Sequence, residues 1–239
     1  MKIIIDSEEN LAKKAAQRYV ELIGNNPKAI IGGATGSTPL GLYAELVKLN
    51  KEGKISFKDV KSFNLDEYVG LDGTHDQSYR YFMNHNLFDH IDIDINNTRV
   101  PDGINTEIAA AYDKEIEAAG GIDLQLLGIG VDGHIGFNEP GTPWDSVTHV
   151  VELTQNTREV NSRFFASLDE VPTHAVTMGI KTVMNARAII LMAIGKSKAE
   201  IVKKFIEGPV DPEVPASILQ LHPFVEVYLD PEAASLLEK

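Results

Sequence analysis

The sequence has 239 residues, of which 43% are hydrophobic, so it can bury one large core but is short for two independent domains. Its 22 basic and 35 acidic residues give a net charge of −13 without any block of Lys or Arg, which argues against a nucleic-acid partner. The absence of Cys excludes disulfides and a cysteine nucleophile, and no apolar run approaches the roughly 20 residues of a membrane-spanning helix. We therefore expect one domain, residues 1–239, in the cytoplasm.

Short β-branched runs alternate with amphipathic segments along the chain. The runs predict strands at residues 2–5, 28–31, 60–64, 122–127, 175–178 and 188–194. The amphipathic segments predict helices near residues 8–23, 38–51, 77–87, 105–118, 155–166 and 197–207. This alternation predicts an α/β fold in which helices cover both faces of a mostly parallel sheet. We expect the Pro-rich stretch 208–215 to be a loop within the same domain.

In an open parallel sheet, ligands bind beyond the carboxyl ends of the strands, so the segments that follow the predicted strands are the candidate sites. Four of these segments are rich in glycine or polar residues: 32–39, 66–68, 130–140 and 195–198. We expect these four tips to converge on one rim of the sheet. Because the acidic protein repels phosphates at long range, a phosphate site there must depend on local donors.

The first tip predicts an anion-binding helix N-terminus, formed by Thr35, Gly36, Ser37 and Thr38. Glycine lets the backbone approach a ligand closely, the hydroxyl groups can donate, and a Pro follows at the expected first helical turn. The spacing is neither that of a Walker A loop nor that of a dinucleotide fingerprint. An ordinary Gly-rich turn is the alternative.

Two basic residues are candidates to share that anion. Lys198 lies in the first turn of a predicted helix, where a cation is unfavourable with the helix dipole unless an anion lies nearby. Arg163 stands in the segment 161–165, NSRFF. Each is equally compatible with a solvated surface cation, and these residues alone leave the choice open.

The third tip brings Asp132, His134 and Glu139 within eight residues, among glycines that leave the backbone free to bend. Two carboxylates beside one imidazole favour its protonated form, and such a His can transfer protons near neutral pH. A metal site is one alternative, although no second His or Cys stands at ligand spacing. A structural Asp-Gly turn with a hydrogen-bonded His is another.

The second tip carries a carboxylate directly after a predicted strand. Asp66 stands there, and a rigid strand is where a catalytic carboxylate is best positioned. The alternative is that Asp66 and Glu67 form an acidic pair on the surface that caps a turn.

Four segments together resemble the glucosamine-6-phosphate deaminase family: 33–39 (GATGSTP), 63–70 (FNLDEYVG), 128–140 (GIGVDGHIGFNEP) and 219–223 (LQLHP). The resemblance runs through nearly the whole chain, and the second and third segments are long enough to be specific. It implies a Rossmann-like sheet. We expect the site to use neither a cofactor nor a metal. The resemblance also implies the conversion of glucosamine 6-phosphate to fructose 6-phosphate and ammonia, in amino-sugar catabolism.

The resemblance further implies a role for each candidate residue. Asp66 would take the proton from carbon 2 and return it to carbon 1, after which the resulting ketimine is hydrated and loses ammonia. His134, assisted by Asp132 and Glu139, would open the sugar ring by moving a proton from the anomeric hydroxyl to the ring oxygen. The residues implied for the phosphate group are Thr35, Gly36, Ser37, Thr38, Arg163 and Lys198.

The segment from about 145 to 170 resembles the mobile lid of that family, which closes over the active site. Members that are activated allosterically carry basic residues shortly after the Asn-Glu-Pro motif and a longer C-terminal tail. Here residues 144–151 contain no Lys or Arg, and the sequence ends at Lys239. We therefore expect no regulatory site for N-acetylglucosamine 6-phosphate, and a monomer or small homo-oligomer.

Two other functions are compatible with this fold class. A 6-phosphogluconolactonase shares the fold and a similar substrate, but it hydrolyses an ester and does not need a base at carbon 2, so Asp66 in its Asn-Leu-Asp-Glu-Tyr context argues against it. A sugar-phosphate sensor that regulates transcription would need a DNA-binding segment, for which we expect no residues to remain. Because fold alone does not separate these functions, the site must decide.

Overall fold

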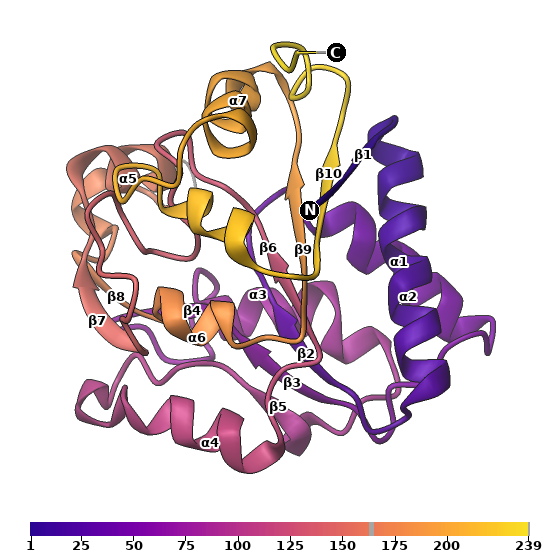
Figure 1. Cartoon of the computed structure of the whole chain (residues 1–239). Coiled ribbons are helices and arrows are strands. Elements are labelled where there is room, and N and C mark those ends of the chain that lie inside the picture. The colour runs from indigo at the N-terminus through magenta and orange to yellow at the C-terminus, as the bar shows by residue number, and fades with distance from the viewer. Residues whose placement is uncertain (163–164, 239) are drawn as a thin grey trace.

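A seven-stranded parallel sheet forms the centre of the computed structural model, which describes residues 1–162 and 165–238 (Figure 1). Every neighbouring pair of strands in this sheet is parallel. The strands, in spatial order, are β1 (Lys2–Ile5), β10 (Val225–Leu229), β9 (Ala188–Ala193), β6 (Leu124–Leu127), β2 (Ile30–Gly33), β3 (Lys61–Asn64) and β5 (Thr98–Arg99). The inner strands β2 and β6 are buried along their whole length, as expected for a sheet covered on both faces.

A smaller antiparallel sheet continues from the end of β3. Its strands, in spatial order, are β4 (Asp66–Tyr68), β8 (His174–Thr177) and β7 (His149–Glu152). Only Leu65 separates β3 from β4, so the chain passes from one sheet into the other almost without a break. This continuity fixes the backbone at Asp66 from both sides.

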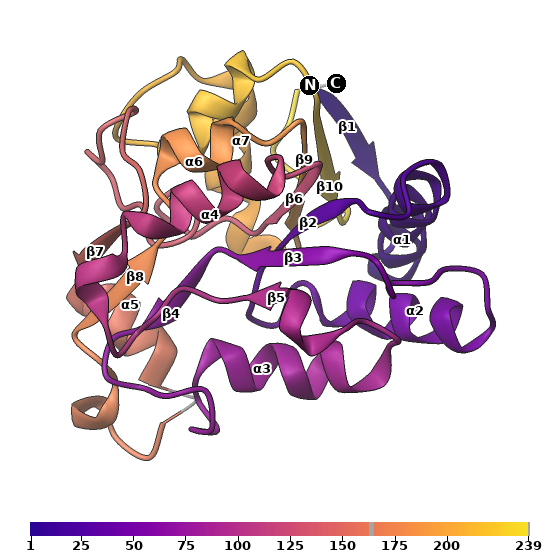
Figure 2. The ribbon, with the colours of Figure 1, turned by 90° about the horizontal axis from the view of Figure 1, so that it is seen from below.

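Helices cover both faces of the main sheet, with α1 to α3 on one face and α4, α6 and α7 on the other (Figures 1 and 2). Their bounds are α1 (Glu8–Asn25), α2 (Leu40–Lys51), α3 (Tyr79–Asn86), α4 (Ala111–Ala119), α5 (Gln155–Asn161), α6 (Ile180–Met184) and α7 (Ala199–Glu207). The first helix begins where the Ser7 side chain accepts a hydrogen bond from the Asn10 amide, the usual N-cap arrangement. None of the helices in the described part of the chain is long and apolar enough to cross a membrane.

The strand order reverses its direction between β2 and β6. From β2 the chain moves to β3 and β5 with its helices on one face, whereas from β6 it moves to β9 and β10 with its helices on the other. The loops that leave β2 and β6 therefore diverge and open a crevice between them. Crevices at such a reversal are where open α/β sheets bind ligands.

The predicted fold class is confirmed, whereas several predicted elements are wrong in place or extent. The strand predicted at 175–178 belongs to the smaller antiparallel sheet, because a short apolar run does not reveal its partner. The helix predicted at 105–118 begins only at Ala111, because the Asp102 side chain accepts hydrogen bonds from the amides of Ile104 and Asn105 and holds a turn there. The helix predicted at 155–166 ends at Asn161. Strand β10 was missed, although it lies inside the sheet.

Candidate active site

A cavity of about 550 Å³ opens at the reversal point of the main sheet. It is lined by residues from all four tips: the segments that follow β2, β3, β6 and β9. The beginnings of α3 and α5 complete its wall through Ser78 and Thr157. Helix α5 therefore also lines the crevice that the strand order creates.

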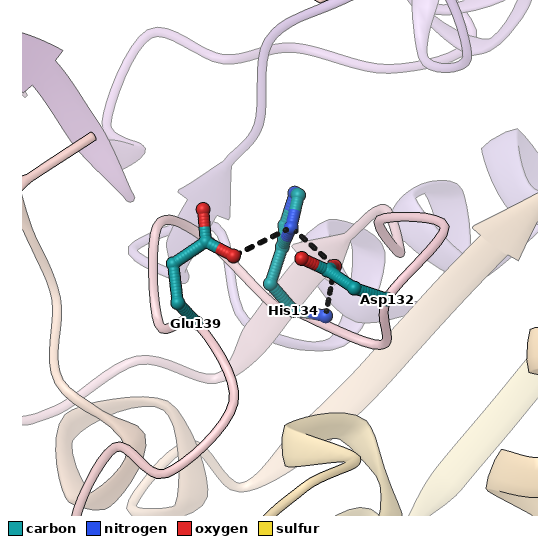
Figure 3. A group of neighbouring side chains, drawn as sticks. All are labelled: Asp132, His134 and Glu139. Atoms are coloured by element: carbon teal, nitrogen blue, oxygen red, sulfur yellow. Dashed lines mark hydrogen bonds and ion pairs between the residues drawn. The ribbon is translucent and has the colours of Figure 1, made fainter. Parts of the chain in front are cut away.

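His134 lies against this cavity with two carboxylates at the same ring nitrogen (Figure 3). Its Nδ1 is 2.7 Å from Asp132 Oδ1 and 3.6 Å from Glu139 Oε2. The backbone N–H of His134 also donates to Asp132 Oδ1, at 3.2 Å. Because both carboxylates lie at Nδ1, the other ring nitrogen, Nε2, points away from them and is the atom available for proton transfer.

Charge decides the protonation of this cluster. Burial alone lowers the pKa of His134, but the hydrogen bonds and charges of Asp132 and Glu139 outweigh it and raise that pKa to about 9. Burial likewise opposes ionisation of Asp132, yet the hydrogen bond with His134 holds the pKa of this carboxyl well below its usual range. His134 is therefore an imidazolium near neutral pH and can act as an acid.

Gly130 is required for the position of the His134 ring. A β-carbon at residue 130 would lie 2.2 Å from His134 Cε1, closer than two such atoms can approach. The backbone N–H of Gly130 donates to the carbonyl of His134, at 2.9 Å. The glycines of this tip thus let the ring fold back onto the backbone, as the sequence pattern predicts.

Asp66 occupies a different environment on the same cavity. Its side chain is only 6% exposed, and burial raises its pKa to about 8, with a further contribution from the neighbouring Glu67 charge that His134 partly offsets. A β-carbon added at Gly136 would lie 3.7 Å from Asp66 Oδ2, so the third tip packs directly beside this carboxyl. The cavity is thus lined by a buried carboxyl that is held neutral, that of Asp66, and by an imidazole that two carboxylates keep protonated, that of His134.

Glu67 is buried as well, which excludes the surface acidic pair. Its carboxylate accepts hydrogen bonds, each of 2.9 Å, from the amides of Tyr68, Tyr79 and Arg80. Tyr79 and Arg80 are the first residues of α3, so Glu67 occupies the N-terminus of that helix. Glu67 therefore fixes α3 to the strand that carries Asp66, a function that the sequence did not suggest.

The candidate anion site lines the same cavity. The segment from Thr35 to Thr38 lines it, as do Ser197 and Lys198. Gly36 has a φ of 96°, a left-handed conformation that glycine adopts without strain, and α2 begins immediately after Pro39. The Lys198 ammonium donates to the carbonyl of Ile129 at 2.7 Å, which holds it beside the third tip. Arg163 lies outside the described residues.

Helix α5 contributes contacts that the sequence analysis missed. Thr157 Oγ1 donates to Glu139 Oε1 at 2.7 Å, and Thr154, the N-cap of the helix, lies 3.4 Å from the same oxygen. At the other end of the helix, Asn161 Nδ2 donates to the hydroxyl of Tyr68 at 3.0 Å. The only sequence signal was the Thr that precedes a helical segment, which is typical of an N-cap and says nothing about Glu139.

Fold and site together define an α/β enzyme that moves protons on a small polar substrate: a buried carboxyl and an ion-paired imidazole face one cavity at the reversal point of a parallel sheet. The comparisons with known proteins are more specific. The model of the family "Glucosamine-6-phosphate isomerases/6-phosphogluconolactonase" matches residues 6–227. The chain belongs to this family.

Similar proteins within the family are closely related over nearly their whole length. A glucosamine-6-phosphate deaminase of Clostridium perfringens is 50% identical over 239 residues, which is 99% of either chain. The solved structure of a monomeric glucosamine-6-phosphate deaminase is 43% identical, with a TM-score of 0.97, and the match covers 99% of this chain and 100% of that one. The 6-phosphogluconolactonase from Trypanosoma cruzi is 23% identical, with a TM-score of 0.78 over 100% of this chain and 97% of that one, which shows a common fold alone.

The raised pKa of Asp66 predicts how stability depends on pH. The carboxyl is held neutral in the folded state, with a pKa of about 8 against its ordinary value of 3.8, so its contribution is complete below pH 4 and is lost as the pH rises toward 8. Asp66→Asn lacks this loss and should gain stability relative to the wild type by about 1.4 kcal/mol per pH unit between pH 5 and pH 7. Thermal melts over this range measure the divergence.

The control for this measurement is Asp59→Asn, which changes an exposed carboxylate. Its melting temperature should follow that of the wild type across the same pH range. Parallel curves for Asp66→Asn and the wild type would show that Asp66 ionises in the folded protein at its ordinary pH.

Proposed function

We propose that this protein is an enzyme that converts glucosamine 6-phosphate and water to fructose 6-phosphate and ammonia. The observation that carries the proposal is the pairing of Asp66 and His134 on one cavity, which the Thr35–Thr38 loop also lines. An aldose–ketose shift needs a base over the sugar carbon and a separate acid near the ring oxygen. Relatives 50% identical to this chain bear the same activity in their names. The enzyme would then serve amino-sugar breakdown in the cytoplasm.

In this proposal His134 opens the sugar ring. Its Nε2 moves a proton between the anomeric hydroxyl and the ring oxygen, while Asp132 and Glu139 stabilise the imidazolium from Nδ1. The raised pKa of His134, about 9, supplies the proton near neutral pH. The imidazole of His134 must also return to its charged form after each proton transfer, and the carboxylates of Asp132 and Glu139 favour that return.

Asp66 then transfers a proton between two carbons. It takes the proton from carbon 2, gives an enolamine, and returns the proton to carbon 1. The ketimine that results adds water at carbon 2 and releases ammonia. Asp66 is the first residue of β4 and follows β3 after a single residue, so its backbone is fixed by both strands. Its carboxylate is therefore held rigidly enough to serve both carbons.

Binding of the substrate should lower the high pKa of Asp66, so that it can act as a base. A carboxyl with a pKa of about 8 is mostly neutral at pH 7 and cannot accept a proton. The ammonium group on carbon 2 of the substrate would lie next to Asp66, and an adjacent positive charge favours the carboxylate. A ligand without that amino group would leave Asp66 mostly protonated, so the site favours amino sugars as substrates.

The remaining predicted residues would bind the phosphate and exclude water. The Thr35–Thr38 loop offers hydroxyl and backbone donors near the start of α2, and Lys198 adds a cation to the lining of the same cavity. We propose that Arg163 also binds the phosphate. The segment 145–170 would act as a lid, since α5 already forms part of the cavity wall. Its closure keeps water out until the ketimine forms.

One assay tests the function. The purified protein is incubated with glucosamine 6-phosphate, and ammonia and fructose 6-phosphate are measured separately. We expect both products in equal amounts. A protein that releases neither product, but hydrolyses 6-phosphogluconolactone, would be a lactonase instead.

Activity should survive prolonged chelation. The side-chain oxygens and nitrogen of Asp132, His134 and Glu139 lie within 4.8 Å of one another, which is close enough for a shared metal ion. However, Nδ1 already lies 2.7 Å from Asp132 Oδ1, and the pKa of about 9 means that a proton occupies the position where a metal would bind. Turnover measured after dialysis against EDTA should therefore equal that of the untreated enzyme. Loss of turnover that one divalent metal restores would establish a metal site.

Kinetics should be hyperbolic and independent of N-acetylglucosamine 6-phosphate. A second phosphate site needs cations, and residues 144–151 contain no Lys or Arg. We also propose a monomer or small homo-oligomer, since a deaminase of similar structure is described as monomeric. Titration of N-acetylglucosamine 6-phosphate at sub-saturating substrate, combined with light scattering, measures both properties. Marked activation of a sigmoidal curve would contradict the proposal.

A further inference from the structure

We propose that Thr157 of α5 is a positioning residue: its hydroxyl holds one oxygen of Glu139 so that the other oxygen stays beside His134. The proposal rests on the proposed role of the His134 cluster, to which it adds a residue from the lid segment. It links the docking of α5 to the arrangement of the groups that open the sugar ring.

The contact is short and buried. Thr157 is 5% exposed and Glu139 is 9% exposed, and the distance between Thr157 Oγ1 and Glu139 Oε1 is 2.7 Å. Figure 3 shows that one oxygen of Glu139 faces the imidazole while the other points away from it. The oxygen that faces the ring is Oε2, at 3.6 Å from Nδ1 of His134. Thr157 donates to the other oxygen, Oε1.

Thr154 supports this arrangement but does not replace it. Its hydroxyl lies 2.9 Å from Thr157 Oγ1 and 3.4 Å from Glu139 Oε1, and it also accepts the backbone amide of Thr157 as the helix cap. Without the Thr157 hydroxyl, Oε1 would keep only the longer contact. A Glu side chain has three rotatable bonds. When the hydrogen bond from Thr157 to Oε1 is lost, the carboxylate of Glu139 is free to turn away from the imidazole of His134.

Helix α5 is attached to the site at both of its ends. Thr157, in its first turn, contacts Glu139, and Asn161, at its last residue, donates to the hydroxyl of Tyr68 at 3.0 Å. Because the hydrogen bond of Thr157 connects α5 with Glu139, a change at either residue should affect the other. Loosening Glu139 should therefore loosen α5, and removing the Thr157 hydroxyl should misplace Glu139.

The first test compares two substitutions at one position. Thr157→Val keeps the shape of the side chain and removes the hydroxyl, whereas Thr157→Ser keeps the hydroxyl. We expect Thr157→Val to lower kcat by roughly tenfold or more, the effect of losing a hydrogen bond to a charged group, with KM within about twofold. Thr157→Ser should recover most of the lost kcat. Since Thr157 also lines the cavity, a rise in KM with unchanged kcat would show direct substrate contact and overturn the proposal.

The second test is a double-mutant cycle with Glu139→Ala. In that background no carboxylate remains to be held, so adding Thr157→Val should change kcat by less than about twofold. Equal losses in both backgrounds would overturn the proposal. Thr182→Val is the matched control, because it removes another buried hydroxyl that donates to a carboxylate, that of Asp113, away from the cavity. It should leave kcat within about twofold.

A third measurement does not depend on activity. Hydrogen–deuterium exchange at the amides of residues 155–161 should speed up in Thr157→Val and also in Glu139→Ala, but not in Thr157→Ser. If the wild type released no ammonia, the proposed function would fail while this comparison still decided the link. Unchanged exchange in Glu139→Ala would overturn the inference even if Thr157→Val failed to fold.

Discussion

The reversal of strand order between β2 and β6 is the constraint on which the rest of the structure depends. Strands on one side of this point lead to helices on one face of the sheet, and strands on the other side lead to helices on the other face. The two loops that diverge there carry the segment proposed to bind the phosphate and the His134 cluster. A short connection then brings Asp66 to the same edge. The cavity is therefore a consequence of topology, and its chemistry comes from four short loops.

Local environment, rather than the charge of the whole protein, determines the chemistry of these loops. The protein carries a net charge of −13, yet its buried site contains an imidazolium and a neutral carboxyl. Two carboxylates at Nδ1 keep the proton on His134, while burial and Glu67 keep the proton on Asp66. An amino-sugar phosphate carries the two charges that this site can use, since its ammonium would ionise Asp66 and its phosphate would meet the donors of the first tip.

The sequence was sufficient for the fold class and for the short-range part of the site. Strand alternation predicted the sheet, and the glycines around His134 and its two carboxylates stand within one segment, so their proximity is local. Contacts between segments that are distant in the sequence could not be predicted from it. Glu67 binds the amides of α3, and Thr157 reaches Glu139 across 18 positions of the chain. Strand β10 was missed because both of its neighbours stand far from it in the chain: β1 lies at the opposite end of the sequence, and helix α7 comes between β9 and β10.

The central claim is that Asp66 moves a proton between carbon 2 and carbon 1. The most direct measurement runs the wild type and Asp66→Asn with glucosamine 6-phosphate in deuterated water and follows deuterium at both carbons by NMR. The account predicts exchange in the wild type, a fall of roughly 10²–10⁴-fold in the variant, and nearly unchanged binding of the sugar phosphate. Exchange at the normal rate in Asp66→Asn would contradict it.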